Sequence, residues 1–203
     1  FEEISPEKQK TILTEMEKRE AADLIDEMSP DDAADLLASI SDEKKEEILQ
    51  LMDPEESREL RELLRYPENT AGGIMTTEYA SVKGNITTKE VMDELRRIAD
   101  DVETLYYIYV LSDDETLKGI LTIRELLLND DNTPIYDYMK HEFISVDVHE
   151  EEDEVAKIVA KYNLIALPVV DESNKMKGII TVDDAIDIIL PTAWKKRIPK
   201  MFR

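Results

Sequence analysis

The chain has 203 residues, enough for one or two compact domains, and its 48 acidic and 25 basic residues give a formal net charge of −23. Such a charge repels nucleic acid phosphates and anionic membranes and attracts cations, so we expect no nucleic acid partner. The absence of cysteine excludes disulfides and thiolate metal sites, and no apolar run approaches the roughly 20 residues that cross a bilayer. Because the chain begins with Phe1, we expect it to be a piece of a longer protein.

A repeat of twelve residues fills the first third of the chain. Five segments align without gaps when the chain is cut at Ser5, Glu17, Ser29, Ser41 and Asp53. The eighth residue of every segment is Ile or Leu, and the twelfth is Met, Ile or Leu. Repetition of this kind indicates a short unit that cannot bury its apolar side alone and stacks on its neighbours.

Each repeat is predicted to form one short helix and a tight turn. Ser29-Pro30 is typical of a helix start, with Ser as the N-cap and Pro at the first helical position. The third repeat places apolar side chains at i, i+3, i+4 and i+7, as one stripe: Ala33, Leu36, Leu37 and Ile40. We therefore expect residues 1–64 to form an all-α superhelical repeat domain, called the helical domain below.

Two acidic residues of the third repeat lie on the helix face opposite its apolar stripe. Asp31 and Asp35 are four residues apart and share that face, which points toward solvent or another domain. Like charges at this spacing repel each other unless a cation lies between them. The pair is a candidate for contact with a metal or a partner. The alternative is that acids in a first turn only favour the helix dipole.

Two similar α/β segments follow a linker at residues 65–74. The first unit, residues 75–132, and the second unit, residues 133–190, each show a short β segment, a helix, a strand, a polar turn, a second strand and a helix. Gly119 and Gly178 occupy matching places in the two units, and we expect them at tight turns that lead into buried strands.

This order of elements closely resembles the cystathionine-β-synthase (CBS) domain. The strongest markers are Val169-Val170-Asp171 and the run from Gly178 to Asp184, with a weaker copy around Gly119. The resemblance implies an α/β tandem CBS-domain pair that packs pseudo-symmetrically and dimerises. Such pairs are regulatory, are usually attached to an enzyme, channel or transporter, and often hold adenine nucleotides in their cleft.

The whole chain is similar to the cytosolic region of MgtE-type magnesium transporters. The repeats, the junction Ala71-Gly72-Gly73-Ile74-Met75-Thr76 and the strand Tyr106-Tyr107-Ile108-Tyr109-Val110 carry this likeness. It implies a homodimer formed through the CBS domains at the cytoplasmic face of the cell membrane, attached covalently to a transmembrane pore domain. It also implies that the region senses Mg²⁺ and gates the pore. We hypothesise that Mg²⁺ favours a compact dimer and that the compact form closes the pore.

The same resemblance implies which acids bind Mg²⁺. Asp184 and Asp187 open the last helix of the second unit, and an acidic pair of the helical domain, best matched by Asp31 and Asp35, would complete sites across the interface. Asp153 matches a further ligand position. At Asn163 the family often has Asp, so a site there would carry less charge. Two carboxylates about 4 Å apart repel by roughly 4 kcal/mol at an effective dielectric constant of about 20, and Mg²⁺ would cancel that repulsion.

ATP is implied as a second ligand, because some relatives bind it in the CBS cleft. The matching positions are Tyr107 for base stacking, Arg124 for phosphate and Glu125 for the ribose hydroxyls. Family members tend to have Asp at the last of these, and Glu is longer. Without the resemblance, Tyr107 is interpreted as a core aromatic residue and Arg124 as a solvated base.

No catalytic arrangement is found in the sequence, so we do not expect an enzyme. The two histidines, His141 and His149, lack metal-ligand spacing. Residues 191–203 hold five bases, no acid and several large apolar groups, which suits a membrane interface or an amphipathic linker. The resemblance implies that they are the start of a connecting segment to the membrane pore. Two alternatives remain: an adenine-nucleotide-sensing CBS module that controls a different enzyme or transporter, and a scaffold whose acidic repeats dock a basic partner.

Overall fold

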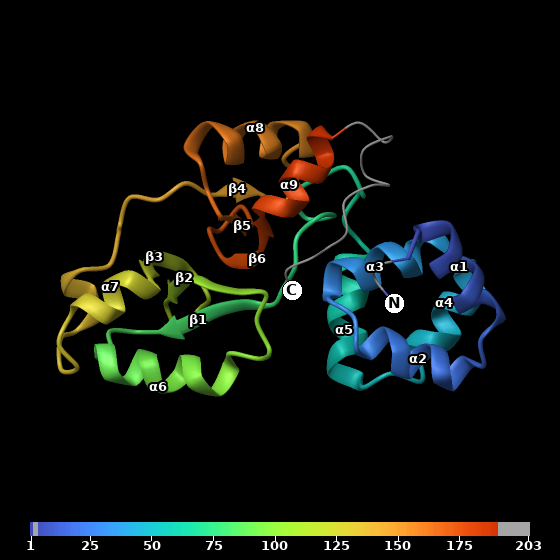
Figure 1. Ribbon diagram of the computed structural model, residues 1–203, viewed down its shortest axis with the longest axis horizontal. Helices are drawn as coiled ribbons and strands as arrows, with labels where there is room; N and C mark the ends of the chain where they lie inside the picture. The colour runs from blue at the N-terminus through green and yellow to red at the C-terminus, as the bar shows by residue number, and fades with distance from the viewer. Residues whose placement is uncertain (2–3, 191–203) are drawn as a thin grey trace.

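A computed structural model describes residues 1 and 4–190 of the chain. Figure 1 shows a bundle of short helices beside two α/β units. The predicted connecting segment, residues 191–203, lies outside the described residues. In the part that is described, no helix has both the length and the apolar character that crossing a membrane requires.

Each twelve-residue repeat forms one helix, as predicted. The helices are α1 (Pro6–Glu15), α2 (Lys18–Asp26), α3 (Pro30–Ser39), α4 (Asp42–Leu49) and α5 (Pro54–Leu63). Each packs on the helix two places further along: α1 on α3, α2 on α4 and α3 on α5. The repeated apolar positions Leu36, Ile48 and Leu60 are buried, whereas Ile12, at the outer end of the stack, is 40 % exposed. The stacking therefore supplies the apolar contacts that a single repeat lacks.

The two α/β units repeat one order of elements. The first contains β1 (Tyr79–Lys83), α6 (Thr88–Ile98), β2 (Thr104–Leu111), β3 (Leu117–Thr122) and α7 (Ile123–Leu128), and a short 3₁₀ turn, η1 (Ile135–Asp137), follows it. The second contains β4 (Val146–Asp147), α8 (Glu152–Tyr162), β5 (Ala166–Val170), β6 (Met176–Thr181) and α9 (Val182–Ile189). In each sheet the first pair of strands is parallel and the second pair antiparallel. The predicted α/β pair is confirmed.

The segment that leads into each unit pairs with the sheet of the other unit. Thr76, ahead of β1, forms an antiparallel bridge with Ile179 in β6. Lys140, ahead of β4, forms the matching bridge with Ile120 in β3. The two units are therefore interlocked through their lead-in segments.

Gly119 and Gly178 leave room for the lead-in segments at this interlocking. The prediction that they lie in tight turns is wrong. Both lie inside strands, β3 and β6, and neither has a positive φ. A Cβ at Gly178 would lie 2.5 Å from the backbone oxygen of Thr76, and one at Gly119 would lie 2.8 Å from Sδ of Met139. The glycines are needed because the lead-in segments cross these strands at close range.

Gly178→Ala is expected to lower the free energy of unfolding by about 3 kcal/mol, because the added methyl group meets backbone atoms that cannot move independently. Urea unfolding of the whole chain measures the loss. Gly84→Ala is the matched control: Gly84 has a φ of +72° and open space around it. The Gly84→Ala variant should lose only about 1 kcal/mol of the free energy of unfolding, from backbone strain alone. Equal losses in the two variants would contradict the close-approach explanation.

The linker between the helical domain and the first unit runs along the second unit. The N–H of Ala71 donates to the Glu150 carbonyl and the N–H of Gly72 to the Val148 carbonyl, both over 2.8 Å. Buried apolar residues of the helical domain and of the second unit belong to one continuous core. An ion pair of 3.2 Å between Lys177 in β6 and Glu62 in α5 also joins them. The helical domain is thus attached chiefly to the second unit.

Candidate metal centre

Acidic side chains of α3 and α9 approach each other where the helical domain meets the second unit. Figure 1 places α3 on the side of the helical domain that is nearer to α9. The negative charge of Asp31 in α3 is one of the causes that raise the pKa of Asp184 in α9. The two carboxyl groups are therefore close enough to repel each other, although they belong to different domains.

Asp31 has a carboxylate oxygen that the described part of the protein leaves without a partner. Its Oδ1 atom is buried and has no hydrogen-bond partner. Burial first, and then the charge of Asp32, raises the pKa of Asp31 to about 6, against partial compensation from backbone N–H groups and the Ser29 hydroxyl. A buried oxygen without a partner costs free energy, and a cation would remove that cost.

Asp35 lies one helical turn further along α3. Burial first, and then the charges of Asp31, Asp32 and Glu68, raises its pKa to about 6. Part of its side chain still contacts solvent, so its repulsion is screened more than that of Asp31. Asp31 and Asp35 thus interact with each other, and their role as a metal-binding pair stays a prediction.

Among these three aspartates, Asp184 has the pKa that is raised most. Burial raises its pKa to about 7, a hydrogen bond from Thr181 opposes the rise, and the charges of Asp31, Asp183 and Glu103 add to it. Thr181 is the N-cap of α9, and its hydroxyl lies 2.6 Å from Oδ1 of Asp183 and within hydrogen-bonding distance of Asp184. Asp184 is therefore held at the start of α9 by the Thr181 hydroxyl. Asp31, Asp35 and Asp184 are called the acidic cluster below.

The other candidate ligands lie outside the acidic cluster. Asp187 is one turn further along α9 than Asp184 and is exposed. Asp153 is exposed in the first turn of α8, where its charge acts on Lys157. Asn163 ends α8 in the left-handed conformation, with a φ of 51°, which is a common role for Asn at a helix end.

Two further acids interact with the acidic cluster, and the sequence did not predict that they would. Glu68 acts on Asp35 from the linker, and Glu103 acts on Asp184 from the residue before β2. Neither shares a repeat position or a helical spacing with the aspartates, so only the fold reveals them. Among residues 1 and 4–190, no three acidic or histidine side chains converge closely enough to hold an ion as they stand. Mg²⁺ keeps several of its waters and commonly uses only one or two carboxylates directly.

The candidate nucleotide residues gather at one end of the first sheet. Tyr107 in β2 pairs with Thr122 at the end of β3, and Thr122 is the N-cap of α7. Glu125 accepts a hydrogen bond of 2.8 Å from the Thr122 N–H, and its other oxygen lies 3.6 Å from Nζ of Lys140. Arg124 is exposed beside it. Glu125 is thus already engaged in capping α7, which limits its use for ribose hydroxyls.

Comparison with known proteins places this architecture in a family. Residues 1–69 match the MgtE intracellular N domain, and residues 71–130 and 135–191 match the CBS domain. The magnesium transporter MgtE of Thermus thermophilus is 43 % identical over 125 residues, which are 62 % of this chain and 28 % of that protein. The MgtE of Enterococcus faecalis is 42 % identical over 126 residues, again 62 % of this chain and 28 % of the relative. The chain thus spans well under half the length of these curated relatives.

Two solved structures share the fold over most of the chain. The soluble part of a magnesium transporter is 42 % identical, with a TM-score of 0.87, and the match covers 90 % of this chain and 72 % of that one. The cytosolic domain of the Mg²⁺ channel MgtE, solved in complex with ATP, is 34 % identical, with a TM-score of 0.67, over 92 % of this chain and 86 % of that one. From its helical repeats to its interlocked α/β pair, the chain belongs to the MgtE family, as an MgtE N domain followed by tandem CBS domains.

Proposed function

We propose that this chain is the Mg²⁺-sensing cytosolic regulatory region of a magnesium transporter or channel. Mg²⁺ bound between the acidic faces of the helical domain and the second unit favours a compact dimer, and the compact dimer closes an attached pore. The observation that carries this proposal is the buried, unpartnered Oδ1 of Asp31, whose charge raises the pKa of Asp184 across the domain boundary. No catalytic activity is part of the proposal.

Electrostatic repulsion supplies the mechanism. When the acids are ionised and no cation is present, the acidic cluster pushes α3 and α9 apart, by roughly 4 kcal/mol for two charges about 4 Å apart at an effective dielectric constant of about 20. Mg²⁺ offsets this repulsion and so binds the compact state more tightly than the open one. A ligand shifts such an equilibrium only by its differential affinity for the two states, and several weak sites acting together can provide it.

The proposal assigns different roles to the five candidate ligands. Asp31, Asp35 and Asp184 hold Mg²⁺ directly or through its waters; the effect of the Asp31 charge on the pKa values of Asp35 and Asp184 supports this assignment. Asp187 follows Asp184 by one turn and contributes through bound water at the exposed rim. Asp153, on α8, belongs to a separate and weaker site.

Small-angle scattering tests the proposal on the whole chain. Adding millimolar MgCl₂ to the metal-free protein should lower the radius of gyration, and calorimetry should detect the binding. Ca²⁺, which needs more oxygen ligands, serves as the comparison cation. An unchanged radius of gyration in saturating Mg²⁺ would exclude the proposed mechanism. A response to ATP alone would favour the nucleotide-sensing alternative.

Exposed apolar residues support a homodimer formed through the CBS domains. On α7, Leu127 and Leu128 are 71 % and 74 % exposed, and on α9, Ile186 and Ile189 are 47 % and 60 % exposed. The two helices hold matching places in the two units. Paired apolar faces of this kind are typical of an interface, and a second copy of the chain would bury them.

Leu128→Asp is expected to raise the dissociation constant of this dimer by about tenfold or more, because a charge would be buried in an apolar interface. The side chain is exposed in the single chain, so folding should be unaffected. Sedimentation velocity over a dilution series measures the change. Leu51→Asp, at a position 50 % exposed in the helical domain, is the matched control and should leave the dimer intact. If both variants dimerise equally, the interface lies elsewhere.

ATP is proposed as a second ligand, because a relative's cytosolic domain was solved in complex with ATP. Tyr107 and Arg124 would contact base and phosphate, and Glu125 would reach the ribose only by giving up part of its capping role. The proposal also places the chain at the cytoplasmic face of the cell membrane, attached to a transmembrane pore domain. Calorimetry with ATP, with and without Mg²⁺, tests whether the nucleotide binds.

A further inference from the structure

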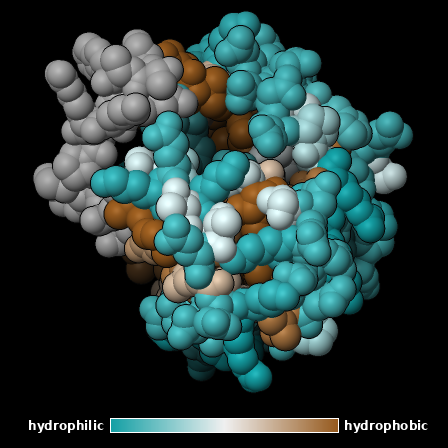
Figure 2. Space-filling model, turned by 90° about the vertical axis from the view of Figure 1, so that its right-hand side faces the viewer, coloured by the Kyte–Doolittle hydropathy of each residue, from teal (hydrophilic) through white to brown (hydrophobic). Residues whose placement is uncertain are grey.

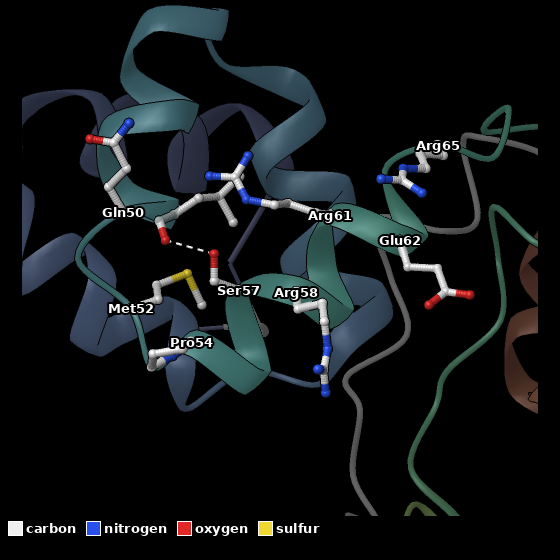
Figure 3. Close-up of a pocket in the computed structure, with 9 residues that line it drawn as sticks. Gln50, Met52, Pro54, Ser57, Arg58, Arg61, Glu62 and Arg65 are labelled. Carbon is white, nitrogen blue, oxygen red and sulfur yellow. Dashed lines mark hydrogen bonds between the residues drawn. The ribbon is translucent and has the colours of Figure 1, made fainter.

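A groove of about 580 Å³ lies at the end of the helical stack. Leu49, Met52 and Pro54, from the end of α4, the following turn and the start of α5, line it, although Leu49 and Met52 are only 3 % and 7 % exposed. Arg58, Arg61 and Arg65 line it along α5 and the turn after it, as Figure 3 shows. Apolar residues bordered by basic ones suit an occupant that is both apolar and acidic.

The groove is built by fixed contacts. The Ser57 hydroxyl donates to the Leu49 carbonyl over 2.7 Å, the bond drawn dashed in Figure 3, and ties the end of α4 to α5. Arg61 holds Glu46 of α4 through two hydrogen bonds of 2.7 and 2.8 Å. The relative positions of α4 and α5 along the groove are therefore set before any partner binds.

The charge of the groove is opposite to that of the molecule. Arg58, Arg61 and Arg65 follow at i, i+3 and i+7, so they form one stripe on a chain with a net charge of −23. Arg58 and Arg65 are exposed, and Arg58 makes no hydrogen bond or ion pair with the residues that the structure describes. The one acid in the lining, Glu62, is paired with Lys177. In Figure 3 the arginine side chains point in different directions, which suits several separate carboxylates better than one phosphate.

The position of the groove indicates the shape of its occupant. Each helix of the stack packs on the helix two places further along, and the series ends with α5 because the chain then passes to the α/β units. A sixth helix in the same series would lie on α4, beside α5, along this groove. Figure 2, which views the molecule from the helical-domain side, shows a mostly hydrophilic surface interrupted by a few apolar patches. Repeat stacks need a special end unit or a partner to cover such a face.

We propose that this groove docks an amphipathic helix with acidic residues, supplied by a partner protein, in the place of a sixth repeat. Its carboxylates pair with the exposed Arg58 and Arg65, and its apolar side chains cover Pro54 and the small exposed parts of Leu49 and Met52. Arginine at the edge of an apolar groove is typical of such interfaces, and Met adapts to apolar side chains of different shapes.

A peptide with the chain's own repeat sequence provides the probe. Residues 29–40, synthesised as a stapled fluorescent helix, carry three aspartates and the apolar stripe of the third repeat. Fluorescence anisotropy with the whole chain, in chelator, should show saturable binding that weakens with added salt. The double variant Arg58→Glu/Arg65→Glu should weaken it by about tenfold or more. Arg19→Glu, an exposed base on α2, is the matched control and should change it less than about twofold.

Three results would overturn the proposal. The first is equal binding to wild type and to the double variant. The second is equal binding of a peptide whose aspartates are replaced by lysine. The third is displacement of the probe by inorganic phosphate as effectively as by unlabelled peptide, which would indicate a simple anion site. Concentration-dependent self-association that only the double variant abolishes would assign the groove to a second copy of the chain instead.

Discussion

The double variant Asp31→Asn/Asp184→Asn is expected to lose the Mg²⁺ response. In the wild-type chain, Mg²⁺ at a hundred times its dissociation constant should stabilise the fold by about 2.7 kcal/mol and lower the radius of gyration. The variant should show neither effect, because its amide oxygens carry no net charge to attract the ion. Thermal unfolding and small-angle scattering, each with and without MgCl₂, measure both.

The metal-free variant should also be more stable than the metal-free wild type. Neutral amides remove the repulsion between α3 and α9 and the cost of burying ionised carboxyl groups. Asp113→Asn, at an exposed acid in the turn between β2 and β3, is the matched control and should respond to Mg²⁺ like wild type. A double variant that still compacts in Mg²⁺ would show that other acids carry the response.

In the absence of divalent cations, the chain is expected to become less stable as the pH rises from 5 to 8. The pKa values of Asp31, Asp35 and Asp184 are about 6, 6 and 7 in the folded chain, above the ordinary value of 3.8. The folded state therefore holds protons that the unfolded state has released. This stabilisation is fully present below about pH 4 and is lost as the pH rises through 6 to 7. For Asp184 the difference of about three pKa units corresponds to at most roughly 4 kcal/mol.

Two other carboxyl groups have shifted pKa values, one raised and one lowered, and they affect this experiment differently. Burial, and then the interaction with Asp26, raises the pKa of Glu56 to about 7, so Glu56 adds to the same trend. The Arg61 hydrogen bond lowers the pKa of Glu46 to about 2. Glu46 therefore changes the pH dependence of stability only in acid, below its ordinary pKa of 4.5. Urea unfolding at pH 5 and pH 8 measures the trend, and Asp184→Asn should flatten it. Greater stability at pH 8 than at pH 5 without a cation would contradict the prediction.

The helical domain could be predicted in detail because its signals are local. The repeated apolar positions and starts such as Ser29-Pro30 depend only on residues within one helix and its neighbours, and the structure confirms them. Helical spacing also placed Asp31 and Asp35 on one helix face, and the charge of Asp31 does act on Asp35. Ile12 departs from the pattern only because no preceding repeat covers it among the described residues.

Features that depend on distant parts of the chain could not be predicted. Gly119 and Gly178 looked like turn residues, since nothing nearby in sequence shows that another segment crosses their strands. Glu68 and Glu103 join the surroundings of the acidic cluster only through the folded arrangement. The approach of Asp31 to Asp184, over 150 residues apart, was available only from family resemblance.

The exchange of lead-in segments between the two units determines how this protein can be divided. A truncated protein that ends at residue 132 would lack Lys140 and leave an edge of β3 uncovered. Thr76 would likewise have lost Ile179, its bridge partner in β6. Uncovered strand edges pair readily with other chains, so the isolated first half should aggregate during expression. The two halves are therefore expected to be useful in an engineered fusion only when they are transferred together.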